Sequence, residues 1–200
     1  MYLENTCHIE EHTFSDNILN SIIKLGEEKQ ISNAEVFDGD KSEKTRKTKV
    51  SWIKEDEISV SPFSYEEQAG TTPLNDIISR ANKTAGWNFQ LHGFEPFQYS
   101  IYEKDDHYDW HIDSHAKPYD DGLIRKLSFT LCLSDDYTGG DFELCKPNPK
   151  PEKHIYKKFE LKKGSMIIFP SFVWHKVNPV LSGVRKTLVG WVVGKQFVWV

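Results

Sequence analysis

The 200-residue sequence lacks most features of secreted, membrane-spanning or nucleic-acid-binding proteins. Its cysteines, Cys7, Cys132 and Cys145, are odd in number and never form a C-x-x-C pair, which argues against a disulfide framework or a thiolate zinc site. The formal net charge of −5 gives no global positive field for nucleic acid or anionic lipid. No hydrophobic run predicts a signal or membrane segment. We therefore expect a cytoplasmic protein without nucleic-acid or membrane partners.

Glycine and proline are also too few for a collagen-like or low-complexity chain, at 12 and 9 residues. Hydrophobic residues make up 38% and charged residues 28%, as in a folded globular protein. The length predicts a single domain over residues 1–200.

The first part of the chain carries two helical patterns. Apolar residues recur at helical spacing from Ser15 to Lys29, and again from Thr72 towards Gly86. Between them, Asp38 to Lys49 is almost entirely charged or hydroxyl-bearing, which predicts a surface loop. We expect residues 1–87 to form a mostly helical support region.

Beyond residue 87 the pattern changes to short strands separated by turn residues. Asp135 to Gly140 is expected to reverse the chain, because glycine reaches a positive φ without steric cost. Many short strands without alternating helices predict a mostly β (α+β) protein built as an antiparallel sandwich or jelly roll. The expected strands are Phe97–Tyr102, Trp110–Asp113, Leu127–Ser134, Asp141–Cys145, Ser165–Phe169 and Arg185–Val193.

The densest chemistry lies around His111 and Asp113. Two residues apart on a strand, these side chains point to the same face and can bind one ion. His175, which follows the apolar run 166–170, can supply a third ligand from a facing strand. Two imidazoles and one carboxylate form the facial set typical of non-haem Fe(II) sites.

A rival assignment places zinc on His107, His111 and His115, which would share one face of a helix. Asp109 and Trp110 do not fit an amphipathic helix, and the neighbouring segments have strand patterns. We therefore favour the strand-borne ligand set.

Arg185 lies ten residues after His175 and alternates with Thr187, Val189 and Trp191 on one face of a strand. Its planar guanidinium suits a bidentate clamp for a ligand carboxylate. The alternative is an edge-strand arginine that points to solvent.

The succession of His111, Asp113, His175 and Arg185 along the chain resembles that of the 2-oxoglutarate and Fe(II)-dependent dioxygenases, in their prolyl 4-hydroxylase-like branch. The resemblance covers roughly residues 88–194. It implies a double-stranded β-helix (jelly roll, cupin-like) over residues 88–200, with the N-terminal helices packed on its outer face. The residues that carry it are Tyr102, His111, Asp113, Gly139, Gly140, His175 and Arg185, and the stretch from Lys163 to Trp191 is similar to bacterial PKHD-type hydroxylases.

The resemblance also implies roles for individual residues. His111, Asp113 and His175 match the iron ligands. Arg185 matches the residue that pairs with the distal carboxylate of 2-oxoglutarate, and Tyr102 matches a tyrosine that helps to hold this cosubstrate. Three further residues are expected to line the pocket or, as an equal alternative, to pack in the core: Tyr108, Thr130 and Trp191.

The implied activity is hydroxylation of an unactivated C–H bond with O2, giving succinate and CO2, with ascorbate as a candidate reductant. The expected substrate is a prolyl residue in a protein or peptide. The alternatives are a free amino acid or small metabolite, a cupin-like metalloenzyme that does not use 2-oxoglutarate, and a binding module. Residues 38–49 and 114–122 are candidates for a substrate lid.

Overall fold

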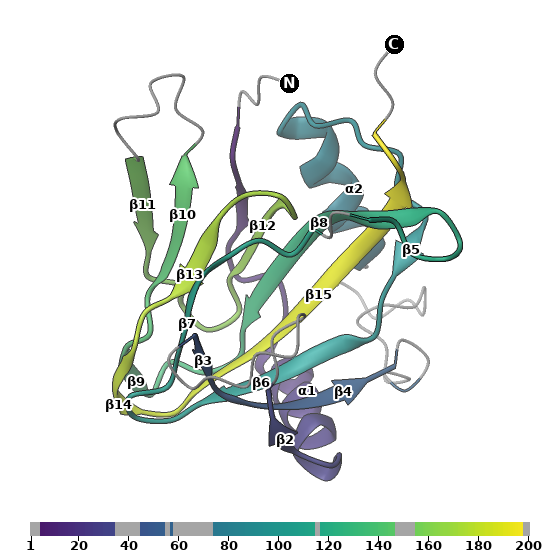
Figure 1. The fold of residues 1–200 in the computed structure, drawn as a ribbon. Coiled ribbons are helices and arrows are strands. Elements are labelled where there is room, and N and C mark those ends of the chain that lie inside the picture. Colours follow the sequence, from purple (N-terminus) through teal and green to yellow (C-terminus); the bar gives the residue numbers. More distant parts are fainter. Residues whose placement is uncertain are drawn as a thin grey trace.

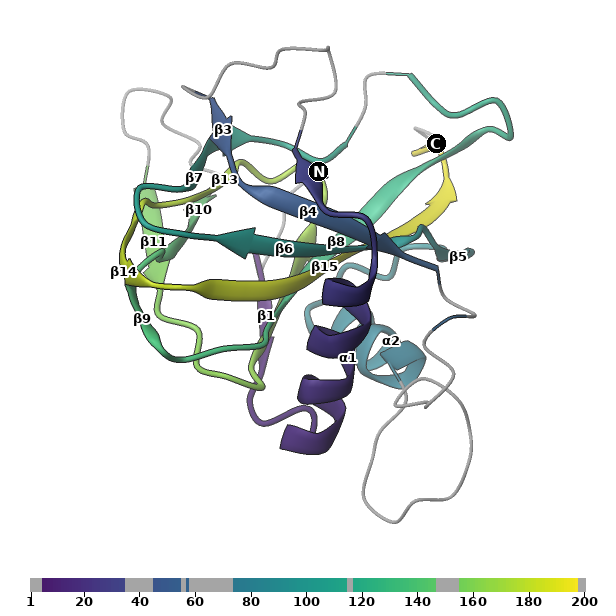
Figure 2. The ribbon, with the colours of Figure 1, turned by 90° about the horizontal axis from the view of Figure 1, so that it is seen from below.

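The computed structural model describes residues 5–34, 45–54, 57, 74–114, 117–146 and 155–197. Two antiparallel sheets pack face to face, and two helices cover the outer face of the larger one (Figures 1 and 2). This arrangement confirms the expected mostly β fold with helices on its outer face.

The larger sheet has eight strands among these residues, and its centre is formed by the long strands β8 and β15. An eighth strand, β5 (Gly93–Phe94), pairs with β15 off the main path. The order of the others is β1 (His8–Glu10), β12 (Met166–Pro170), β8 (Leu123–Cys132), β15 (Arg185–Lys195), β6 (Phe97–Tyr102), β4 (Lys49–Ile53) and β2 (Ser32–Asn33).

The smaller sheet lies on the side of β8 and β15 that faces away from the helices (Figure 1). A separate two-stranded ribbon joins β9 (Tyr137–Gly139) to β14 (Val180–Gly183). The order of the smaller sheet is β11 (Ile155–Phe159), β10 (Phe142–Lys146), β13 (His175–Val177), β7 (His107–His111) and β3 (Arg46–Lys47).

Strand alternation divides the apolar residues between two cores. On β12, Met166 and Ile168 join the core under the helices, whereas Ile167 and Phe169 pack between the sheets. The helices α1 (Asp16–Glu28) and α2 (Leu74–Thr84) bury one face each against the larger sheet. Among the residues described, neither helix has the length and apolar character that crossing a bilayer requires.

The structure corrects several local expectations. The strand predicted over Trp110–Asp113 is β7, which ends at His111. The turn predicted over residues 135–140 contains the short strand β9, although Gly139 and Gly140 do have positive φ. The helical region before residue 87 also supplies strands to both sheets, because its extended segments pair with β12, β6 and β7.

Of the loop predicted over residues 38–49, residues 38–44 lie outside the described part, and residues 46–47 and 49 belong to β3 and β4. The start predicted for the second helix, residues 72–73, also lies outside it.

Gly26 lets α1 approach the larger sheet closely. A Cβ at this position would overlap the ring of Tyr99, which is fully buried on β6. The hydroxyl of Ser51 on β4 also donates a hydrogen bond of 2.7 Å to the Gly26 carbonyl. The helix α1 therefore lies so close to the sheet that residue 26 has no space for a side chain.

We expect Gly26→Ala to lower the free energy of unfolding. Alanine gains about 1 kcal/mol of helix propensity, but overpacking a rigid core costs about 1–3 kcal/mol. Urea unfolding should show a net loss of about 1 kcal/mol, whereas the exposed control Asn20→Ala on the same helix should show none. Equal midpoints for the two variants would contradict the close approach.

Candidate metal centre

Three candidate ligands meet where β7 and β13 pair. His111 ends β7, and the register places it directly opposite His175, the first residue of β13. Asp113 follows two residues after His111, beyond the end of the strand. Its backbone N–H donates to the carbonyl of Ser171 at 2.8 Å, which anchors the bend that carries the carboxylate.

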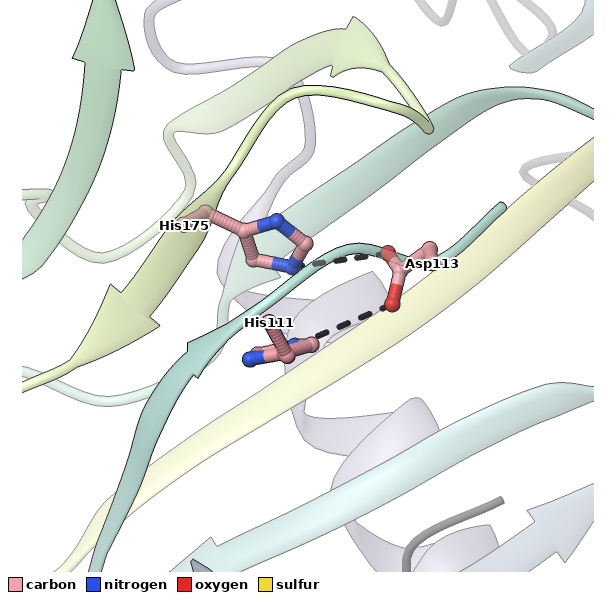
Figure 3. Close-up of side chains that lie close together, drawn as sticks. All are labelled: His111, Asp113 and His175. Atoms are coloured by element: carbon pink, nitrogen blue, oxygen red, sulfur yellow. Dashed lines mark ion pairs between the residues drawn. The ribbon is translucent and has the colours of Figure 1, made fainter. Parts of the chain in front are cut away.

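The three side chains converge on one point between the sheets (Figure 3). Asp113 Oδ1 lies 3.7 Å from His111 Nε2, and Oδ2 lies 3.5 Å from His175 Nε2. One donor atom from each residue lies within 4.8 Å of the others. The side chains are 5–12% exposed, so the group is nearly enclosed by protein.

Backbone contacts fix which imidazole nitrogen faces the centre. The Nδ1–H of His111 donates to the carbonyl of Asp109 at 2.7 Å, and that of His175 donates to the carbonyl of Val173 at 2.9 Å. This assignment leaves the Nε2 lone pair of each ring directed towards Asp113, as a metal ligand requires.

The electrostatics favour the ligand forms of two of these residues. Burial, together with neighbouring His175, lowers the pKa of His111 to about 3, so this ring is neutral at physiological pH. Burial alone would raise the pKa of Asp113, but the facing imidazoles outweigh it and lower the value to about 2. A neutral ring and an ionised carboxylate are the forms that bind metal.

A stack of side chains supports His111 from behind. The ring of Tyr108 lies 3.5 Å from the imidazole, centroid to centroid, and nearly parallel to it. The Arg46 guanidinium lies 4.4 Å from the centroid of the Tyr108 ring. β3 therefore reaches the metal centre through Tyr108.

A cavity of about 580 Å³ opens onto the three ligands. Four residues named from the sequence line it, namely Tyr102, Tyr108, Thr130 and Trp191. Polar and aromatic residues that the sequence analysis did not single out also line it, from segments far apart in the chain, among them Arg46, Trp52, Tyr119 and Arg125. The two lid candidates thus contribute to the lining, residues 38–49 with Arg46 and residues 114–122 with Ser114 and Tyr119.

Arg185 is placed differently from the others. It is 1% exposed and lines a second cavity of about 560 Å³, not the cavity of the three ligands. Its Cζ lies 5.3 Å from the centroid of the Tyr102 ring, which does face the ligands. Among the described residues, the Nε of Arg185 has no hydrogen-bond partner. The alternative of an edge-strand arginine that points to solvent is therefore wrong.

Gly140 makes room for this arginine. A Cβ at Gly140 would lie 2.9 Å from Cδ of Arg185, and φ at Gly140 is +63°. Glycine therefore satisfies both the backbone conformation and the space that the arginine needs.

The alternative zinc site on a helix does not form. Residues 107–111 are a strand, so His107 and His111 do not share a helical face. His115 lies outside the described residues. The two-histidine, one-carboxylate set therefore remains as the candidate metal centre.

The donor set fits a divalent ion such as Fe(II). Imidazole and carboxylate ligands suit this metal, and three protein ligands on one side leave about three octahedral positions open towards the cavity. The buried Arg185, with an orphaned Nε and no carboxylate within ion-pair distance among the described residues, fits an anionic ligand. Fold and site together define a double-stranded β-helix protein with a non-haem metal centre.

Comparisons with known proteins agree with this class. Residues 97–193 match the family model of the 2OG-Fe(II) oxygenase superfamily. A PKHD-type hydroxylase of Synechococcus sp. (strain CC9311) is 40% identical over 128 residues, which are 60% of this chain and 52% of the relative. The chain thus spans about half the length of this relative.

Solved structures share the fold. A prolyl-4-hydroxylase of Pseudomonas putida superimposes with a TM-score of 0.66 at 17% identity, covering 97% of this chain and 95% of that one. A prolyl hydroxylase of Trichoplax adhaerens, in complex with a hypoxia inducible factor peptide fragment, gives 0.67 at 19% identity, covering 94% and 84%. Residues 97–193 thus resemble the 2OG-Fe(II) oxygenase superfamily, and the chain shares the fold of solved prolyl hydroxylases.

We expect the protein to bind one Mn(II) ion, as a redox-stable substitute for Fe(II), through these ligands. Asp113→Asn and His175→Ala should each weaken Mn(II) binding by roughly 100-fold or more in calorimetry, because each removes one of only three protein ligands. His107→Ala, on the same strand as His111, is the matched control and should bind normally. Normal binding by Asp113→Asn would remove this residue from the metal centre.

Proposed function

We propose that this chain is a 2-oxoglutarate-dependent Fe(II) dioxygenase that hydroxylates an unactivated C–H bond with O2, giving succinate and CO2. The observation that carries this proposal is the buried His111–Asp113–His175 set at the floor of an open cavity. Because β1, β2 and β4 complete the larger sheet, we also propose that the N-terminal region and residues 88–200 act as one catalytic domain.

The protein residues divide the work of binding. His111, Asp113 and His175 would hold Fe(II), and the bound ion with 2-oxoglutarate and O2 supplies the oxidising chemistry. Arg185 would pair with the distal carboxylate of 2-oxoglutarate, because burying a guanidinium without an anionic partner is costly. Tyr102 links these two places, since its ring borders both the metal cavity and Arg185.

Apolar side chains would keep water from the reacting centre. Phe169 packs against His175 with ring centroids 4.6 Å apart, and Phe142 does so at 5.6 Å. Val189 and Trp191 line the opposite side of the cavity from β15. An enclosed centre limits oxidation that is not coupled to substrate.

The substrate is a peptide or a small molecule, and we propose a prolyl residue in a peptide. Trp52 and Tyr119 line the cavity, and Trp52 is 49% exposed. Such aromatic faces suit an apolar ring carried by an extended chain. The Trichoplax relative of the same fold is solved with a peptide fragment bound. We propose a cytoplasmic location, in keeping with three free cysteines, and ascorbate as reductant.

We expect added Fe(II) to support conversion of 2-oxoglutarate to succinate, measured by mass spectrometry, with a +16 Da product when prolyl peptides are supplied. His111→Ala and Asp113→Ala should lose nearly all turnover, because each removes a metal ligand. His107→Ala should retain it. Full turnover by either ligand variant would contradict the proposed chemistry.

Arg185→Ala should raise the apparent KM for 2-oxoglutarate by roughly 100-fold, because an ion pair buried from water is lost. Mn(II) binding should be unchanged, since Arg185 is not a ligand. Lys186→Ala is the matched control, because Lys186 faces the other side of β15 and pairs with Glu27 at 2.7 Å. An unchanged KM in Arg185→Ala would remove this arginine from the cosubstrate site.

A further inference from the structure

Glu95 joins three segments beside the metal cavity without lining it. This residue lies between β5 and β6, and its carboxylate accepts hydrogen bonds from Nε and Nη2 of Arg125 at 2.8 and 2.6 Å. The hydroxyl of Tyr119 donates to the same carboxylate at 2.8 Å. The backbone N–H of Glu95 also donates to the carbonyl of Trp191 at 3.0 Å.

Both partners of this carboxylate are part of the cavity wall. Arg125 and Tyr119 line the cavity that opens onto the metal ligands. The guanidinium of Arg125 lies 4.0 Å from the ring centroid of Trp191, which also lines the cavity. Glu95 does not line the cavity, but its two hydrogen bonds to Arg125 fix the plane of a guanidinium that does.

The Glu95–Arg125 ion pair is partly buried, with side chains 19% and 15% exposed. Burial would lower the pKa of Arg125, but its bonds to Glu95 and its attraction to this carboxylate raise it. Asp113 also attracts Arg125, and Arg125 contributes to the low pKa of Asp113. Arg125 is therefore paired with Glu95 and lines the same cavity as a second carboxylate, that of the metal ligand Asp113.

We propose that Glu95 is a positioning residue that holds Arg125 against Trp191 and away from Asp113, so that the Asp113 carboxylate stays available to the metal. A guanidinium released from Glu95 would pair with Asp113, the carboxylate that lines the same cavity, and a metal ion would then have to displace it. The hydrogen bond from Tyr119 holds the β7–β8 connection against the same anchor.

The inference rests on the metal centre of the proposed function but not on turnover. Its test is therefore the Mn(II) affinity measured by calorimetry. We expect Glu95→Gln to bind Mn(II) roughly tenfold more weakly, because the freed Arg125 competes for Asp113. Removing the competitor in the double variant Glu95→Gln/Arg125→Met should restore the affinity to within about twofold of wild type.

Two controls separate positioning from a merely structural role. Glu10→Gln breaks a different ion pair, in which Nε and Nη2 of Arg80 bond one carboxylate oxygen at 3.1 and 2.9 Å, and should leave Mn(II) affinity unchanged. Glu103→Gln breaks an exposed ion pair with Lys49 at 2.9 Å and should also bind normally. Thermal unfolding identifies any variant that fails to fold. If Glu95→Gln fails to fold, Glu95→Asp replaces it. Aspartate keeps the charge but is one methylene shorter, so it should hold Arg125 less well and the variant should bind Mn(II) more weakly than wild type.

Unchanged affinity in Glu95→Gln would overturn the proposal. A loss that persists in the double variant would overturn it as well, because Glu95 would then act on the ligands by a route other than Arg125. Failure of the oxygenase assay with these affinities as expected would contradict the proposed function alone.

Discussion

The antiparallel pairing of β7 with β13 is the constraint on which the site depends. Residues directly opposite each other in such a pair have neighbouring side chains, so the pairing of His111 with His175 brings their ring centroids to 4.0 Å. Backbone carbonyls take up the Nδ1–H of both rings. The remaining lone pairs and the Asp113 carboxylate then face one another in a space that protein nearly encloses. Such a group of electron donors is most stable around a cation.

The larger sheet supports this arrangement because its central strands have two different faces. On β15, Leu188 and Val192 pack in the core under the helices, whereas Val189 and Trp191 line the cavity. On β8, alternate residues likewise turn to the helices or to the cavity, where Thr130 lies. The helices thus bury the apolar face of the sheet and leave the other face for chemistry. A one-residue slip of β15 would exchange these faces.

The sequence predicts the parts of this structure that depend on period and spacing. The six long strands and two helices follow from apolar periodicity, and the ligands follow from the H-x-D pair and His175. The strands β3 and β9 are too short to show a period and are missed, and the five-residue strands β4 and β11 are missed as well. Asp113 shares a face with His111 through a bend anchored at Ser171, and not through strand alternation. The pairing of Glu95 with Arg125 spans thirty residues and leaves no local signal.

The partners of Arg46, Arg125 and Arg185 differ, and this difference explains why Arg185 is suited to binding a cosubstrate. Arg125 forms an ion pair with Glu95, and Arg46 on β3 stacks on the ring of Tyr108 on β7. Arg185 has no carboxylate within ion-pair distance among the described residues, although it is the most deeply buried of the three. A divalent ion bound by Asp113 retains one positive charge, and Arg185 adds a second. A dicarboxylate that spans the two places balances both charges, whereas a monocarboxylate would leave a buried charge uncompensated. Charge balance therefore favours a dianionic cosubstrate at this site.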